Sequence, residues 1–416
     1  AITSSGGTIT LRGDSCDLFC TSVDISGPVN AGAGSIVLMG AGEVRQSGAG
    51  VLTASSLDVT ADSTIDLNLA GNNISSNVDL FTNTGTGASS LVQFSNSASS
   101  FNLSRAVAKG DVIFTIDGNM TTSGPVQSTT GFVDIVSNGA GSSLSFGHDV
   151  AAGATGVFLQ TNNGPIIQTG GSVTTSGPSI FAAGTGAISF PNLTNDINDI
   201  QLIGGDIHVV VTNFLSVNSL TRTVPNANLH LQSRFGSLTF SGVGAIDTGT
   251  GTLTLDSGGT LTTPGALSGA SMYLRGAFGM TLAHNITTPG TLQLTADNFI
   301  TQSGGVITVG GATFGGGPPG STNIALTNVS NDFASVGLSG SAIALRDSNA
   351  IVLDAFNVGS SLTVLANGNV TQSAPLIVSG TTSVSSITGN ITLDTPGNNL
   401  NSLSVSGGAI DIVIGT

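Results

Sequence analysis

The chain has 416 residues, of which 39% are hydrophobic, so it contains enough apolar material for a long core. Only 7% of the residues are charged and the formal net charge is −15, which argues against nucleic acid or an anionic membrane as a partner, since both bind basic patches. No apolar run reaches the roughly 18 residues that a membrane-spanning helix needs, so we expect no membrane insertion.

Short segments in which apolar and polar residues alternate recur along the chain. Clear examples are 8–11, 35–38, 56–59, 229–231, 252–255 and 342–345. A period of two residues predicts β-strands with one buried face, and no helical period is present. Segments that contain Gly, Pro or Asn lie between them and predict tight corners. The segment 310–320, rich in glycine and proline, is predicted to be a loop that leaves the stack.

Two motifs recur with nearly constant spacing. The first, Val/Ile-x-Gln-Ser/Thr, occurs at 44–47, 166–169, 300–303 and 370–373. The second begins, 28 to 31 residues after the start of the first, with Asn72, Asn195, Asn331 and Asn398. Such self-similarity predicts a solenoid, in which a unit of about 65 residues makes three turns of roughly 20 residues. We expect these asparagines at corners, where Asn tolerates a left-handed backbone, with their amides bonded to the backbone and stacked from unit to unit.

These patterns predict a single β-solenoid domain over residues 1–416, an elongated rod of roughly 20 turns in which each turn contacts only its neighbours. The first turn, within 1–30, contains both cysteines of the chain, Cys16 and Cys20. They form either a small-loop disulfide in an oxidising compartment or a pair of free thiols packed in the core. No histidine lies near them in the sequence, so we expect no metal site there.

Next to the cysteines, Arg12, Gly13 and Asp14 begin an integrin-type Arg-Gly-Asp-Ser tetrapeptide. The motif is short, and the alternative interpretation is a polar corner beside the cysteine loop.

The sequence contains no catalytic constellation, and we expect no enzyme activity, no cofactor and no metal. Its tightest acidic group is Asp196, Asp199 and Asp206, which is either a cation or sugar site or a set of solvated corners. The four histidines stand far apart without metal-ligand spacing, and we interpret them as structural: His148, His208, His230 and His284.

The C-terminal third resembles a known family. The segments 344–353, 362–373 and 389–393 are similar to the degenerate repeats of the filamentous-haemagglutinin-like exoproteins and related autotransporter passengers of bacteria. The resemblance implies a right-handed parallel β-helix that is secreted to the cell surface and has an adhesive or filamentous role. The N-terminal secretion domain of that family is not evident in this sequence.

Strand alternation is present at both ends of the chain without a charged or helical cap. It runs through Ile2, Ile9 and Leu11 at one end and through Ile410, Ile412 and Ile414 at the other. Unpaired strand edges favour association. Either the chain is a segment of a longer array, or its last turn pairs with the first turn of the next subunit, and we expect the second, head-to-tail stacking. The leading hypothesis is an extracellular structural protein, the subunit of a bacterial surface filament or sheath whose partner is itself. The alternatives are an adhesin passenger that binds host or surface glycans and, third, a polysaccharide-active enzyme.

Overall fold

The computed structural model describes residues 1–13, 22–83 and 90–415, in which every regular element is a β-strand. Contacts within the chain divide it into a first unit, 1–212 with 219–224, and a second unit, 213–218 with 225–416. Both units are parallel β-solenoids, with about 18 turns in all. The predicted fold class is therefore confirmed. No helix long and apolar enough to cross a membrane occurs in the described part of the chain.

The first unit contains these strands: β1 (Ile2–Thr3), β2 (Ile9–Gly13), β3 (Val23–Ile25), β4 (Val29–Asn30), β5 (Ser35–Gly40), β6 (Val44–Gln46), β7 (Leu52–Ala61), β8 (Ile65–Leu67), β9 (Asn73–Thr82), β10 (Val92–Asn96), β11 (Ser100–Ala108), β12 (Val112–Ile116), β13 (Asn119–Thr122), β14 (Val126–Ser128), β15 (Val133–Ala140), β16 (Leu144–Phe146), β17 (Val150–Ala152), β18 (Val157–Asn162), β19 (Ile166–Gln168), β20 (Val173–Ala182), β21 (Ile188–Phe190), β22 (Asp196–Gly204) and β23 (Ile207–Val211). The next strand, β24 (Leu215–Arg222), is divided between the two units.

The second unit continues with these strands: β25 (Leu229–Ser233), β26 (Leu238–Phe240), β27 (Ile246–Asp247), β28 (Thr252–Ser257), β29 (Thr260–Thr262), β30 (Leu267–Ser268), β31 (Ser271–Gly276), β32 (Gly279–Leu282), β33 (Ile286–Thr288), β34 (Leu292–Thr295), β35 (Phe299–Gln302), β36 (Ile307–Gly316), β37 (Asn323–Leu326), β38 (Asp332–Asp347), β39 (Ile351–Leu353), β40 (Phe356–Ala366), β41 (Val370–Gln372), β42 (Leu376–Ser386), β43 (Ile391–Leu393), β44 (Asn399–Ser406) and β45 (Ile410–Ile412).

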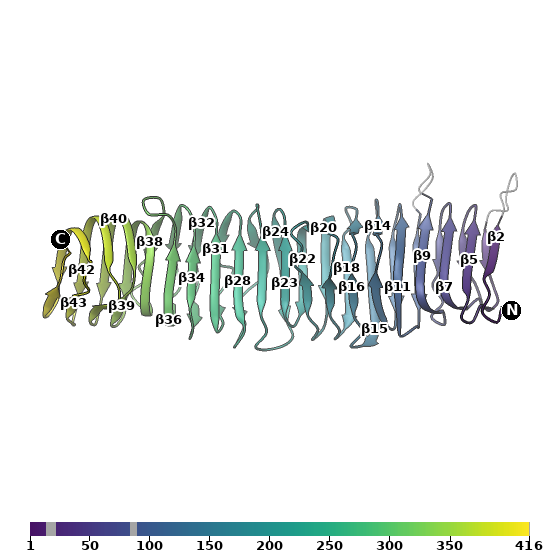
Figure 1. Cartoon of the computed structure of the whole chain (residues 1–416), viewed down its shortest axis with the longest axis horizontal. Helices are drawn as coiled ribbons and strands as arrows, with labels where there is room; N and C mark the ends of the chain where they lie inside the picture. The colour runs from purple at the N-terminus through teal and green to yellow at the C-terminus, as the bar shows by residue number, and fades with distance from the viewer. Residues whose placement is uncertain (14–21, 84–89, 416) are drawn as a thin grey trace. The chain divides into compact units, whose positions relative to one another are not determined.

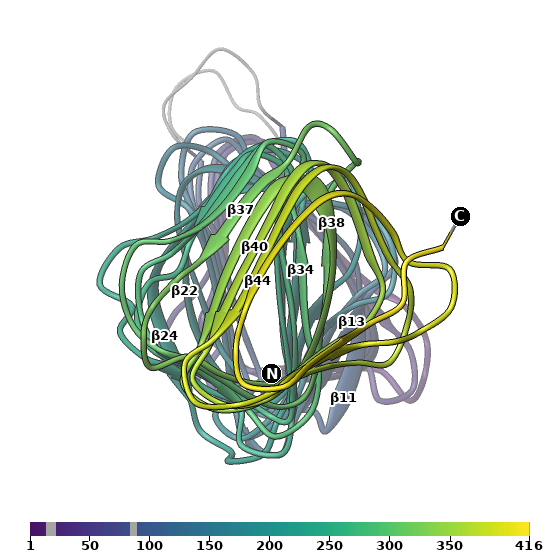
Figure 2. The ribbon, with the colours of Figure 1, turned by 90° about the vertical axis from the view of Figure 1, so that its left-hand side faces the viewer.

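Each strand pairs in parallel with the strand one turn away, and the residue spacing of these pairs gives the length of a turn. In the first unit Ile36 pairs with Leu57 and Leu57 with Val78, a spacing of 21 residues each time. The turn of roughly 20 residues predicted from the repeats is therefore correct. Figure 1 shows β5, β7 and β9 side by side, and in Figure 2 β37, β40 and β44 of the second unit follow one another on one side.

The core consists of columns of apolar residues that continue from turn to turn. In β12, Val112, Phe114 and Ile116 are buried while the residues between them point outward, as the period of two predicts. The ring of Phe114 lies 5.8 Å from that of Phe94 on the preceding turn, in an edge-to-face arrangement. Each turn thereby covers the apolar side chains of its neighbour, and a long core forms without a globular centre.

The glycine-rich segment 310–320 corrects the sequence analysis. Strand β36 runs through residue 316, so the prediction of a loop is wrong for 310–316, and only the following residues form a turn. The glycines are there because the backbones of adjacent turns approach closely. A Cβ atom on Gly311 would lie 2.5 Å from the carbonyl oxygen of Gly290 on the preceding turn.

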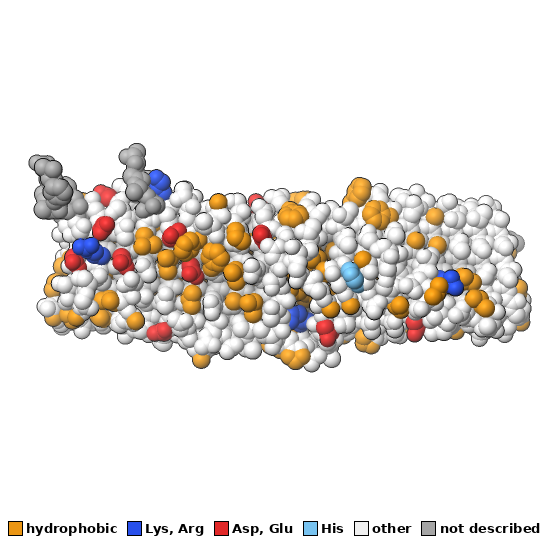
Figure 3. Space-filling model, turned by 180° about the vertical axis from the view of Figure 1, so that it is seen from behind, with side chains coloured by type: hydrophobic (Ala, Val, Ile, Leu, Met, Phe, Trp, Pro, Cys, Tyr) orange, Lys and Arg blue, Asp and Glu red, His pale blue; other side chains and the backbone are white. Residues whose placement is uncertain are grey.

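The few charged side chains of the outer faces are arranged across turns. Arg105 lies 2.8 Å from Asp79, Arg275 lies 2.9 Å from Asp256, and Arg45 lies 3.9 Å from Asp24. In each case the two residues are register partners on adjacent turns. The rest of the outer surface is mostly uncharged, as Figure 3 shows for one face.

We predict that Gly311→Ala lowers the free energy of unfolding by about 1–3 kcal/mol, because the added methyl group forces two backbones apart. The matched control is Gly244→Ala. No atom lies within 4 Å of a Cβ at Gly244, and alanine there restricts the unfolded chain, so it should be neutral or stabilise by up to about 1 kcal/mol. Chemical denaturation followed by circular dichroism measures both, and equal effects would contradict close backbone approach at Gly311.

Candidate functional site

The two recurring motifs meet in space as pairs of amide side chains, in which the asparagine is buried and the glutamine is buried or, for Gln302 and Gln372, half-buried. In each pair the glutamine Nε2 donates to the asparagine Oδ1, and the asparagine Nδ2 donates to the glutamine Oε1. All eight of these hydrogen bonds are present, in the pairs Gln46–Asn72, Gln168–Asn195, Gln302–Asn331 and Gln372–Asn398. Their lengths in the Gln302–Asn331 pair are 2.8 and 2.9 Å. We call these four pairs the amide braces.

Each brace also satisfies backbone groups around one corner, as the Gln302–Asn331 pair illustrates. Gln302 Nε2 donates to the carbonyl of Gly305, within the corner, at 2.9 Å. Asn331 Oδ1 accepts the N–H of Ile307, which begins the next strand, at 3.0 Å. Asn331 Nδ2 donates to the carbonyl of Leu326, five residues before it, at 3.3 Å. The brace therefore ties one turn to the corner of the preceding turn.

The glutamine occupies a position that is apolar one turn earlier. Its register partners there are Ile25, Phe146, Leu282 and Leu353 for the four braces in chain order. The four asparagines are fully buried, with 0% exposure. A buried amide without partners costs about 1–3 kcal/mol, so removing one member of a brace should destabilise the stack.

The expectation for the asparagines is partly wrong. They follow corners and bond to the backbone as predicted, but each pairs with a glutamine instead of stacking on other asparagines. Nor do they adopt the left-handed conformation, which only Asn163 and Asn226 adopt among the described non-glycine residues. The interval of 26 to 29 residues between glutamine and asparagine was the signal for the pairing.

A buried carboxylate, Asp347, occupies a corner of the second unit. Its side chain is 1% exposed and accepts the N–H groups of Phe333 and Asn349 at 2.8 and 2.7 Å. In the first unit Asn96 binds a neighbouring turn in a similar way, accepting the N–H of Ile74 at 2.9 Å and donating to its carbonyl at 3.0 Å. Burial raises the pKa of the Asp347 carboxyl above its ordinary value of 3.8.

The structure describes only part of the proposed adhesion and disulfide sites. Arg12 and Gly13 end β2, and Arg12 is exposed. Asp14, Cys16 and Cys20 lie outside the described residues, so the adhesion motif and the cysteine pairing stay predictions.

The other candidate chemical residues do not converge. Asp196 and Asp199 lie on β22 and Asp206 just before β23, and no three His, Cys, Asp or Glu residues in 1–13, 22–83 and 90–415 could hold one metal ion. The four histidines lie on separate turns. His148 Nδ1 is 3.9 Å from a carboxylate oxygen of Asp149, and burial lowers the pKa of His208.

The residues proposed for stacking differ in exposure. Ile2, Ile410 and Ile414 are exposed, Ile9 is buried, and Leu11 and Ile412 are half-buried. Their contacts with a second chain stay a prediction.

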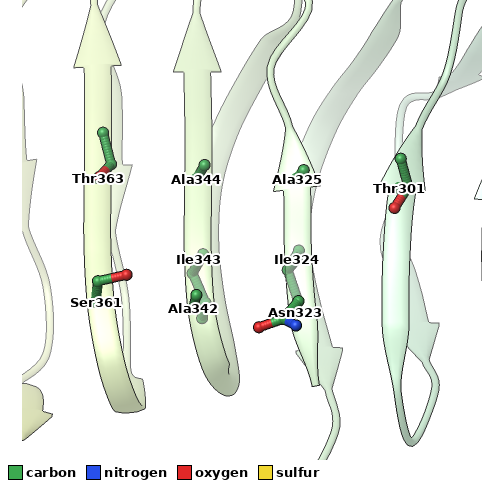
Figure 4. A pocket seen from close by; sticks show the side chains of 9 residues that line it. All are labelled: Thr301, Asn323, Ile324, Ala325, Ala342, Ile343, Ala344, Ser361 and Thr363. Carbon is green, nitrogen blue, oxygen red and sulfur yellow. The ribbon is translucent and has the colours of Figure 1, made fainter. Parts of the chain in front are cut away.

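The outer face of the second unit has a shallow groove of about 240 Å³ that the sequence analysis missed. Figure 4 shows it across β35, β37, β38 and β40, with Ala325, Ala342 and Ala344 at its centre. Thr301, Asn323, Ser361 and Thr363 also line it. A second groove of about 450 Å³ is lined by Gly315, Gly337, Leu338, Ser339, Ala355, Phe356, Asn357, Pro375 and Ile377. Both arise where small outward side chains face one another across turns.

For the braces, we predict that Asn331→Ala lowers the free energy of unfolding by about 2–4 kcal/mol, because it leaves the amide of Gln302 and the N–H of Ile307 without their partner. Gln302→Ala should cost about as much, and the double variant clearly less than the sum of the two. The control is Asn357→Ala, an exposed position on β40. Additive losses in a double-mutant cycle would show that the two amides do not act together.

For Asp347, we predict that Asp347→Asn lowers the free energy of unfolding at pH 7 by about 1–2 kcal/mol, because the two carboxylate oxygens each accept one N–H group and the amide has a single oxygen, so one buried N–H loses its acceptor. Since the pKa is raised, the folded state binds the proton more readily than the unfolded state. The stability that proton binding by Asp347 adds to the folded state is complete below about pH 3.8 and is lost as the pH rises through the folded-state pKa. The loss caused by the substitution should thus grow between pH 7 and pH 4, and a loss independent of pH would contradict a buried titrating carboxylate.

Comparison with known proteins relates the braces to a repeat family. Residues 133–203, 269–338 and 340–407, together half of the chain, match the family described as repeats of unknown function (DUF5649). Each matched segment contains one complete brace, and the fourth, Gln46–Asn72, lies outside them. No curated protein and no solved structure matches the chain. The chain belongs to this family of repeats.

Proposed function

We propose that the chain is an extracellular structural protein, a length of β-solenoid from which a bacterial surface filament or sheath is built. The observation that carries the proposal is the way in which side chains fill the interior of the solenoid. Apolar columns fill it, and the four braces bond their buried amides to one another and to the backbone. The buried polar side chains of the braces thereby serve cohesion. The proposed role is structural, with the chain contributing length, stiffness and an outer surface.

Assembly by head-to-tail contact suits this architecture. The terminal face of any solenoid stack has unpaired N–H and C=O groups, and parallel pairing with a second copy would satisfy them. Such a contact does not close on itself and therefore gives a filament. In β45, Ile410 and Ile412 continue the inward columns of Ile391 and Leu393, so they would meet the apolar residues of the next subunit.

The similarity of the C-terminal third to filamentous-haemagglutinin-like exoproteins supports secretion and a cell-surface location for this proposal. The second candidate, an adhesin passenger that binds glycans, is favoured by the grooves on the outer face of the second unit. The two functions are compatible, because assembly would use the ends of the stack and binding its sides.

We predict that the 416-residue chain forms fibres at high concentration and that Ile412→Lys prevents this while leaving the single solenoid folded, because a buried unpaired charge would lie in the contact. The control is Ser404→Lys, which adds the same charge to an exposed position of β44. Analytical ultracentrifugation and negative-stain microscopy measure assembly, and circular dichroism measures folding. Monodisperse monomers of the unaltered chain at all concentrations would overturn the filament proposal.

A further inference from the structure

The alanine groove on the second unit has a regular construction. Thr301 of β35 pairs in register with Ala325 of β37, Ala325 with Ala344 of β38, and Ala344 with Thr363 of β40. Across four successive turns, the outward side chain is therefore Thr, Ala, Ala and Thr. The groove is the two-turn gap in which only methyl groups cover the backbone, and the threonines form its sides (Figure 4).

A second row of outward residues extends the groove along the strands. Ala342 pairs with Ser361, and Asn323 stands two residues before Ala325 on the same outward face. Beneath the groove, Ile324 and Ile343 point inward and are 2% and 1% exposed, so the floor rests on the packed core. Hydroxyl and amide groups thus line a rigid, uncharged hollow.

Arg346 does not line the groove but lies on the same strand as its lining residue Ala344, and it lacks the ion pair that three other arginines have. It stands two residues after Ala344 on β38 and is half-buried, and its register partner on the next turn is Leu365. Arg45, Arg105 and Arg275 each face an aspartate across a turn, but no ion pair among the described residues includes Arg346. The following residue, Asp347, points inward and binds backbone N–H groups.

We propose that this groove binds an acidic polysaccharide, with Arg346 pairing to a carboxylate of a hexuronate unit. A guanidinium forms two parallel hydrogen bonds with a planar carboxylate, which a neutral sugar cannot provide. Thr301, Asn323, Ser361 and Thr363 offer hydrogen bonds to sugar hydroxyls, and the alanine floor lets the chain approach the sheet.

The size of the groove defines what it can hold. Its volume of about 240 Å³ is below the about 300–1,000 Å³ typical of ligand pockets, so it accommodates a short stretch of a polymer that continues over the open surface. The residues that line it include no aromatic side chain, and the net charge of −15 repels a polyanion at long range. We therefore expect weak binding to a single groove. The binding measurement is made at 0.15 M salt, where charges are screened beyond about 8 Å.

The test uses the 416-residue chain with oligogalacturonate and with the same oligomer methyl-esterified, which removes the carboxylate charge and keeps the sugar. Titration calorimetry should show binding of the acid form and at least tenfold weaker binding of the ester. Arg346→Gln should weaken binding of the acid form at least tenfold, and Ala344→Leu, which fills the groove, should abolish it.

The control variant is Arg234→Gln, which removes the same charge from an exposed position outside the groove and should leave binding unchanged. Thermal unfolding confirms that each variant is folded. Three results would each overturn the proposal: no binding of the acid oligomer at millimolar concentration, equal binding of the acid and ester forms, or binding unaffected by Arg346→Gln. None of them bears on fibre formation, so this inference and the filament proposal fail separately.

Discussion

Each residue of a parallel solenoid lies about 4.8 Å from the residue in register on the next turn, and most features of this chain follow from that contact. An apolar side chain meets another and extends a column, as Ile36, Leu57 and Val78 do. An outward aspartate meets an arginine, as Asp79 meets Arg105. The same contact also makes an unsuitable residue destabilising, because any unpaired polar group or bulky side chain is held against the next turn.

The corners are where this constraint is hardest to meet, because carbonyl and N–H groups turn away from the ladders there. The amide braces solve the problem with two side chains. The glutamine binds a carbonyl within the corner, and the asparagine binds the N–H of the strand that begins after it. Since each amide also binds the other, neither is left with a buried unpaired group.

Sequence reasoning reached the features that depend on local pattern and missed those that depend on register. Alternation predicted the parallel strands, and the motif spacing predicted a turn of about 20 residues. Neither pattern predicted the pairing of Gln302 with Asn331, because that prediction requires knowing which residues of different turns lie next to each other. The glycines of 310–316 suggested a loop by composition, yet they serve close backbone approach. The groove depends on Ala325 and Ala344 being register partners, which no local signal indicates.

The braces also indicate where functional differences between repeats should lie. The residue before each brace glutamine points outward, and it is Arg45, Ile167, Thr301 or Thr371 in the four copies. The interior pair is thus the same while the adjacent outer position changes from charged to aliphatic to hydroxyl. Thr301, which forms one side of the groove, is such a position. A repeat can therefore change its outer surface without altering the brace that holds its turns together.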